Sequence, residues 1–256
     1  MRVTILGCGP STGVPLLGCD CAVCRSTDPR NRRRRSSIVV EEGATRILVD
    51  ASPDLREQLL DAGVSRVDAV LFTHGHADHV HGIDDLRLIN HNNDAPLDAW
   101  SDAPTLAEIE RRFGYAFEPN APGRGWYKPR LVPREITGPF TVGDIDVTPF
   151  EQGHGDGVTL GLRFGPMAYS TDVNALSEDA FRSLAGVELW IVDCLRRAPN
   201  PMHAHLPLTL DWIRRVAPRH ALLTHMNHDL EYHELREELP PGTEPAYDGM
   251  VIDLGP

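Results

Sequence analysis

The sequence predicts an α/β fold of two mixed β-sheets with helices on their outer faces. Three observations support this fold class: a length of 256 residues, short runs of β-branched and aliphatic residues that read as strands, and helical patterns between those runs. A single domain over residues 1–256 is the simplest organisation, because no internal repeat or flexible linker divides the chain.

The first half of the chain predicts four strands and one well-marked helix. The strands are expected at residues 3–6, 38–40, 46–49 and 67–72. Before the last of them, Ser52 is a suitable N-cap, Pro53 fits the first helical position and Gly63 fits the end of the helix. The apolar stripe of this helix consists of Leu55, Leu59 and Leu60.

The second half resumes the strand pattern after an irregular stretch. We expect strands at 145–150, 158–164, 167–169, 187–192, 221–223 and 249–254, and helices at 208–216 and 232–239. Between the halves, residues 90–139 are rich in proline and glycine. That stretch predicts an irregular insertion, which fits a lid over a site.

Composition narrows the range of functions. The 25 Lys and Arg residues against 37 Asp and Glu residues give a formal charge of -12, which argues against a stable nucleic-acid complex held by bulk electrostatics. No run approaches the roughly 18 apolar residues of a membrane span. The five cysteines fit a reducing compartment, and we expect a cytoplasmic protein.

The strongest local signal is the block from Thr73 to His79, which directly follows a predicted strand. It carries His74, His76, Asp78 and His79 within six residues. Neutral imidazole and carboxylate together suit zinc, manganese or iron. The alternative is a solvated polar turn that happens to be rich in histidine, but the ligand types and the position after a strand favour metal binding.

This block resembles the metal-binding motif of the metallo-β-lactamase superfamily, whose fold is an αββα sandwich. The resemblance implies two divalent cations, manganese or zinc with iron as a third option, and further ligands at later strand ends. Candidates stand at the expected places. The resemblance implies one metal held by His74, His76 and His154, and a second held by Asp78, His79 and His225. It also implies that Asp172 bridges the two metals.

Three cysteines form a second candidate metal site near the N-terminus. Cys19, Cys21 and Cys24 have the spacing C-x-C-x-x-C, and His228 in Thr224-His225-Met226-Asn227-His228 offers an imidazole. Three thiolates and one imidazole make a closed, structural zinc site. Redox thiols or ordinary buried cysteines are the alternatives.

The cysteine array and the late THxxH motif together resemble the phosphoribosyl cyclic phosphodiesterases associated with the carbon-phosphorus lyase pathway. The resemblance implies hydrolysis of a small cyclic phosphate, either ribosyl 1,2-cyclic phosphate or a 2′,3′-cyclic nucleotide. It also implies that a histidine before the 208–216 helix assists the reaction. His205 fits this role, with His203 as the alternative. Together with Asp78 of the metal-binding block, His205 is therefore a catalytic candidate.

A run of arginines from Arg32 to Arg35 offers a contact for the substrate phosphate. Guanidinium groups match phosphate oxygens, and Arg34 and Arg35 are the candidates, although a solvated loop is the plainer interpretation. Rival functions are a tRNA 3′-end endoribonuclease, a thioester or lactone hydrolase, and a non-catalytic binding module. The seven metal-competent positions favour catalysis, and a homodimer stays open.

Overall fold

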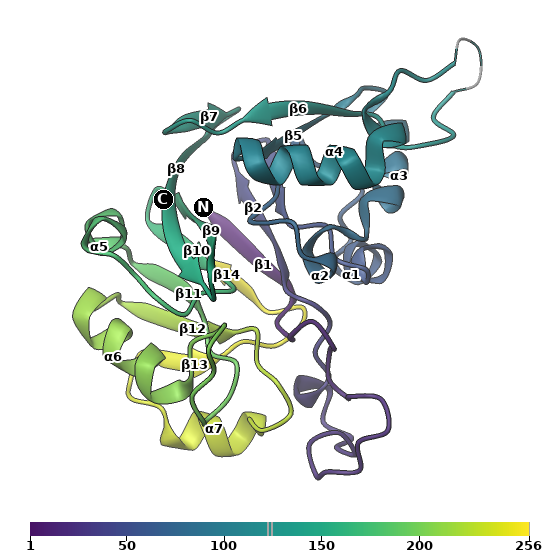
Figure 1. The fold of residues 1–256 in the computed structure, drawn as a ribbon. Helices are drawn as coiled ribbons and strands as arrows, with labels where there is room; N and C mark the ends of the chain where they lie inside the picture. The colour runs from purple at the N-terminus through teal and green to yellow at the C-terminus, as the bar shows by residue number, and fades with distance from the viewer. Residues whose placement is uncertain (122, 124, 256) are drawn as a thin grey trace.

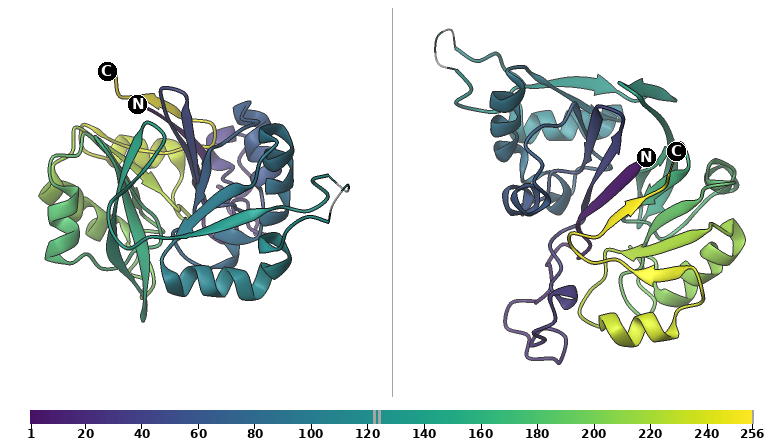
Figure 2. Two further views of the ribbon diagram at one scale, coloured as in Figure 1. Left: turned by 90° about the horizontal axis from the view of Figure 1, so that it is seen from above. Right: turned by 180° about the vertical axis from the view of Figure 1, so that it is seen from behind.

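The computed structural model describes residues 1–121, 123 and 125–255. Two β-sheets of seven strands each lie face to face, and the helices cover their outer faces (Figures 1 and 2). This arrangement confirms the predicted αββα sandwich. No helix among the described residues combines the length and the apolar character needed to cross a membrane.

The first sheet has the strand order β14-β1-β2-β3-β4-β5-β6. Strands β3 to β6 run parallel, whereas β14, β1, β2 and β3 pair antiparallel, so the sheet is mixed. Its strands are β1 (Arg2–Gly7), β2 (Ser37–Glu42), β3 (Thr45–Val49), β4 (Ala69–Leu71), β5 (Leu97–Ser101), β6 (Leu131–Glu135) and β14 (Val251–Asp253).

The second sheet has the order β13-β12-β11-β10-β9-β8-β7, again with a parallel half from β10 to β13. Its strands are β7 (Phe140–Val142), β8 (Ile145–His154), β9 (Gly157–Phe164), β10 (Met167–Ser170), β11 (Leu189–Asp193), β12 (His220–Thr224) and β13 (Thr243–Pro245). The helices are α1 (Leu55–Ala62), α2 (Ala77–Val80), α3 (Leu86–Asn93), α4 (Ala103–Phe117), α5 (Glu178–Leu184), α6 (Leu206–Val216) and α7 (Tyr232–Glu238), with short 3₁₀ turns η1 (Pro29–Asn31) and η2 (Ile83–Asp85).

Alternating residues of the first sheet enter two different apolar cores. Ile38 and Val40 of β2 belong to the core between the sheets, while Val39 between them packs with the helices on the outer face. Ile47, Leu48 and Val49 of β3 divide in the same way. Because successive side chains of a strand point to opposite faces, a strand covered on both sides is apolar throughout, as these are.

Two local predictions need correction. The first helix begins at Leu55 rather than at Pro53, because Ser52 does not cap it. The Ser52 hydroxyl instead accepts a hydrogen bond from Asp54 N at 3.1 Å, in the turn before the helix. Gly63 ends the helix with a φ of 65°, as expected. The stretch 90–139 is not irregular over most of its length, since it contains β5, α4 and β6. Packing of Leu97, Ile109 and Leu131 in the outer core stabilises these elements.

Candidate metal centre

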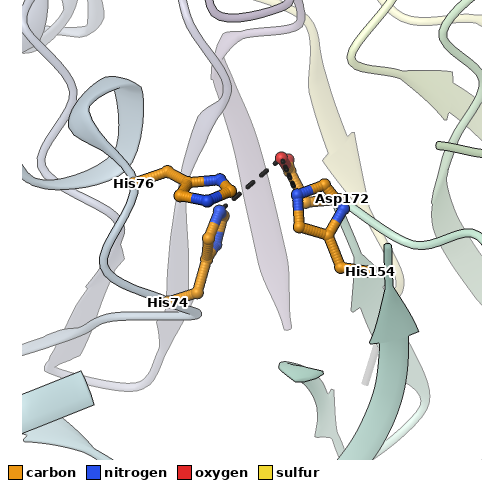
Figure 3. Close-up of side chains that lie close together, drawn as sticks. All are labelled: His74, His76, His154 and Asp172. Carbon is orange, nitrogen blue, oxygen red and sulfur yellow. Dashed lines mark ion pairs between the residues drawn. The ribbon is translucent and has the colours of Figure 1, made fainter. Parts of the chain in front are cut away.

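The histidine-rich loop lies between β4 and α2, and it shares one end of the sandwich with three other strand ends. His154 is the last residue of β8, Asp172 lies two residues after β10, and His225 directly follows β12. Figure 3 shows His74 and His76 facing His154 and Asp172 from opposite sides of the site. Residues more than 150 positions apart in the sequence therefore meet at one point.

The seven residues proposed from the sequence as active-site ligands form two groups that share one carboxylate. In each group, the candidate ligand atoms all lie within 4.8 Å of one another. The first group is His74, His76, His154 and Asp172, and the second is Asp78, His79, Asp172 and His225.

Asp172 divides its two carboxylate oxygens between the groups. Oδ2 lies 3.6 Å from Nε2 of both His74 and His154, whereas Oδ1 lies 3.1 Å from Nε2 of His79 and 3.2 Å from Nε2 of His225. Two donors about 2.1 Å from one tetrahedral cation lie roughly 3.4 Å apart. The spacing on each side of Asp172 is therefore that of ligands around a cation.

Hydrogen bonds hold the opposite ring nitrogens and leave the inward ones free. Nδ1 of His79 pairs with Asp50 Oδ2 at 2.7 Å, Nδ1 of His154 with the Met202 carbonyl at 2.7 Å, and Nδ1 of His74 with the Thr73 hydroxyl at 3.0 Å. These contacts favour the tautomer with the proton on Nδ1, which leaves Nε2 as a metal donor.

The inward atoms have no hydrogen-bond partner among the described residues, although they are buried. They are Nε2 of His74, His79 and His225, and Oδ2 of Asp78. Buried polar groups without a partner are costly, and a cation in each of the two donor groups would satisfy all four. The residues present thus fit a divalent metal.

The metal-free site has strongly coupled charges. Burial alone would raise the pKa of the Asp172 carboxyl, but His225, His79 and His74 hold that pKa well below its usual range. Burial opposes the charge of His225, yet Asp172 and Asp78 raise its pKa to about 9. By contrast, burial lowers the pKa of His74 well below its ordinary value. The site can therefore hold protons where a cation would otherwise bind.

The structure brings His203, and not His205, to this cluster. The His203 ring lies 4.8 Å from that of His154 and stacks on His225 at 4.7 Å between centroids, and its Nδ1 is 2.9 Å from Asp193 Oδ2. His205 instead occupies the N-cap position of α6, with extended backbone and no capping hydrogen bond from its side chain.

The arginine candidates also need correction. Arg34 is paired with Asp61, and Nη1 of Arg35 lies 2.9 Å from Asp54 Oδ1. Both line a cavity of about 510 Å³ beside α1, whereas a different cavity opens onto the histidines. Arg34 and Arg35 are thus paired with the carboxylates of Asp61 and Asp54, in the position where the sequence predicted a substrate phosphate.

The three cysteines meet, but the fourth proposed ligand does not join them. The sulfur atoms of Cys19, Cys21 and Cys24 lie within 4.8 Å of one another, in the segment that extends from the body between β1 and β2 (Figure 1). Backbone N–H groups of Leu16 and Cys24 donate to Cys24 Sγ and Cys21 Sγ. His228 is absent from this group among the described residues, and its Nε2 lies 3.9 Å from Asp229.

Two residues of the site escaped sequence reasoning. Asp50 follows β3 and supports His79, and Asp193 ends β11 and supports His203; both carboxylates are fully buried. The available signal was an aspartate at or just beyond the end of an apolar strand, which is the same context that marks Asp172. Without the strand order, that signal does not say which histidine each aspartate contacts.

The sequence profile of the beta-lactamase superfamily domain matches residues 45–226, which include all seven residues. The chain belongs to the beta-lactamase superfamily. A solved structure described as a new diphosphatase from the PhnP family shares 32% identity with it, with a TM-score of 0.92 over 99% of this chain and 98% of that one. The family resemblance drawn from the sequence is thereby confirmed.

Two other similar proteins extend the comparison. An octanoyltransferase of Porphyromonas gingivalis is 38% identical over 99% of this chain, but the chain spans only 52% of that protein. The zinc-bound PqqB of Methylobacterium extorquens shares the fold, with 22% identity and a TM-score of 0.78 over 99% of this chain and the whole of PqqB. Membership and the His and Asp donors together support a divalent metal at this centre.

Proposed function

We propose that the protein, a metal-dependent hydrolase, cleaves a phosphodiester bond in a small cyclic phosphate, either ribosyl 1,2-cyclic phosphate or a 2′,3′-cyclic nucleotide. The observation that carries this proposal is the division of the two Asp172 oxygens between two donor groups. The likeness to the PhnP-family diphosphatase supports phosphate chemistry over acyl chemistry.

The ligand assignment follows the two groups. We assign the first cation to His74, His76 and His154, the second to Asp78, His79 and His225, and the bridging position to Asp172. When bound by these residues, a pair of divalent cations, manganese or zinc, would supply a hydroxide nucleophile at neutral pH and neutralise charge on the phosphoryl oxygens. Asp50 and the Met202 carbonyl hold His79 and His154 in the orientation that this requires.

His203 takes the general-acid role that the sequence assigned to His205. Asp193 accepts a hydrogen bond from Nδ1 of His203, which fixes the orientation of the ring. Nε2 is then the atom that gives a proton to the departing oxygen of the diester. Because Asp193 is fully buried, this pair resembles the carboxylate and histidine arrangements that orient catalytic imidazoles.

The cysteine group is assigned to one structural zinc. Three sulfur donors within 4.8 Å of one another, two of them accepting backbone N–H bonds, suit thiolate ligation. His228 remains the proposed fourth ligand, and it would have to move toward the sulfurs to bind.

The test is hydrolysis by protein reconstituted with manganese or zinc. We expect turnover of ribosyl 1,2-cyclic phosphate or 2′,3′-cyclic nucleotides, and none of tRNA precursors, thioesters or lactones. Turnover confined to one of the latter substrates would refute the proposal.

His203→Ala and His205→Ala form a matched pair for the general-acid role. His203→Ala should lower turnover of a cyclic nucleotide by about 10²- to 10⁴-fold, and much less that of a nitrophenyl diester, whose leaving group needs no proton. His205→Ala should stay close to wild type on both substrates. The reverse order would return the role to His205.

A further inference from the structure

The cavity that opens onto the metal centre has a distinctive charge. Its volume is about 490 Å³, and its lining includes His74, His76 and His154. The remaining lining comes from the start of α4, the turn between β8 and β9, and Met202. A substrate whose phosphate reaches the metal centre through this cavity must place its other groups against that lining.

The lining is acidic. Asp102, Glu108 and Asp156 belong to it, and no described residue of the lining is lysine or arginine. Asp102 Oδ1 accepts a hydrogen bond from Thr105 N at 2.9 Å and so caps α4. Arg112 lies next to the cavity, but it is paired with Glu108 and with the Gly75 carbonyl. No free cation is therefore available in this lining for a second anionic group.

Glu108 is half-buried and paired with Arg112. A side chain at position 75 would collide with its carboxyl group, so the glycine in the metal-binding loop leaves the space that Glu108 fills. Asp156 is exposed in the two-residue turn between β8 and β9. Glu108 lies in α4 and Asp156 lies in the β8–β9 turn, yet both carboxylates line the same cavity.

The same cavity offers apolar contact. Val158 is 56% exposed and Met202 is 37% exposed, and both are lining residues together with Pro104. Exposed apolar side chains suit a flat uncharged base, and neighbouring carboxylates suit a sugar that carries hydroxyl groups. Carboxylates accept hydrogen bonds from hydroxyls but repel phosphate.

We propose that the substrate carries no anionic group besides its cyclic phosphate and that its uncharged part includes a base, which makes it a nucleoside 2′,3′-cyclic phosphate without a second phosphate. This inference rests on the proposed function: the acidic lining excludes a second phosphate, and the apolar Val158 and Met202 favour a base over the bare sugar of ribosyl 1,2-cyclic phosphate. Glu108 and Asp156 determine the specificity, because they repel a second phosphate on the far side of the sugar. Val158 and Met202 contact the base.

The first experiment compares adenosine 2′,3′-cyclic phosphate with its 5′-phosphorylated derivative on the manganese-loaded protein. We expect kcat/KM to be at least about fivefold higher for the unphosphorylated compound at low ionic strength. The difference should appear in KM and should shrink in high salt, since exposed charges are screened. Equal or better use of the 5′-phosphorylated compound would overturn the inference.

Charge reversal locates the effect. Asp156→Lys, at an exposed turn that tolerates lysine, should abolish or invert the preference, and Glu108→Gln should weaken it while keeping the shape of the side chain. Asp253→Lys is the matched control, because it changes the net charge equally on β14, outside the cavity lining. A preference that Asp253→Lys changes as much as Asp156→Lys does would also refute the assignment.

Calorimetry separates this inference from the proposed function. Adenosine 3′-monophosphate should bind the zinc-loaded protein at least about fivefold tighter than adenosine 3′,5′-bisphosphate. That order, without turnover of any cyclic phosphate, would refute the proposed function and leave the charge selection standing. Tighter binding of the bisphosphate, or no binding of the monophosphate, would overturn the charge selection whatever the turnover.

Discussion

Asp50→Asn tests whether a residue that touches no substrate controls the second cation. Asp50 Oδ1 accepts from Thr73 N at 2.8 Å and Oδ2 lies 2.7 Å from His79 Nδ1. Both oxygens are therefore acceptors for fixed donors. Asparagine has one acceptor oxygen and one NH₂ group, so one of these donors must face another donor.

The expected magnitude follows from the bonds that are lost. A hydrogen bond to a charged group contributes about 1.5–3 kcal/mol, and loss of a partner behind a metal ligand typically weakens metal binding by about 10- to 100-fold. Because a factor of ten corresponds to about 1.4 kcal/mol, the two estimates agree. Burial raises the pKa of Asp50, so the neutral asparagine relieves part of the cost of burying a charge. Metal affinity should consequently change more than the stability of the metal-free fold.

The assay is equilibrium competition with a chelating dye, combined with metal content per chain. Asp50→Asn should keep the first cation and release the second at about 10- to 100-fold lower competitor concentration. Asp68→Asn is the control, because Asp68 is exposed, its side chain accepts from the Arg46 N–H at 2.7 Å, and it belongs to neither donor group of the metal centre. Wild-type affinity for both cations in Asp50→Asn would refute the reasoning.

Three further predictions follow from the same geometry. Asp172→Ala removes the carboxylate shared by both groups, so metal content should fall and diesterase turnover should drop by at least about 100-fold, as measured by elemental analysis and initial rates; full turnover with both cations bound would refute the bridging role. Cys21→Ser should release one tightly bound zinc per chain and lower the melting temperature by roughly 5 °C or more, whereas unchanged zinc and melting would exclude a thiolate site. Because the pKa of metal-free His225 is raised to about 9, its proton stabilises the metal-free fold fully below the unfolded value near 6.5, and that contribution is lost as the pH rises through 9. Metal binding at pH 7 should therefore release protons and strengthen with pH, which calorimetry in two buffers of different ionisation enthalpy checks; affinity independent of pH would contradict the assignment of His225.

Much of the fold could be predicted from local pattern, because the strands are buried on both faces and read as continuous apolar runs. The predicted strands at 38–40 and 46–49 lie within β2 and β3, and the run at 145–150 lies within β8. The region around α4 could not, since its proline and glycine content resembles a loop. Its helix depends on packing against η2, β5 and β6, which no local pattern shows.

The candidate site was predictable where a ligand follows a strand and unpredictable where a partner must be chosen. His154, Asp172 and His225 carry the signal of position alone. The choice between His203 and His205 depends on a buried carboxylate at the end of β11, ten residues earlier in the sequence. Likewise, Arg34 and Arg35 bind Asp61 and Asp54 of the neighbouring α1 region, a contact that only the tertiary structure provides.

Backbone conformation explains why strand ends can supply this site. Asp50, Asp172 and His225 have φ values of 62°, 50° and 57°, in the left-handed region that side chains other than glycine rarely adopt. Such residues cost of order 1–3 kcal/mol each and persist when surrounding contacts impose them. The left-handed turn interrupts the alternation of the strand directly at its end. The side chain of Asp172 can then face the histidines from both sheets. The geometry of the metal centre therefore depends on strained backbone at the strand ends.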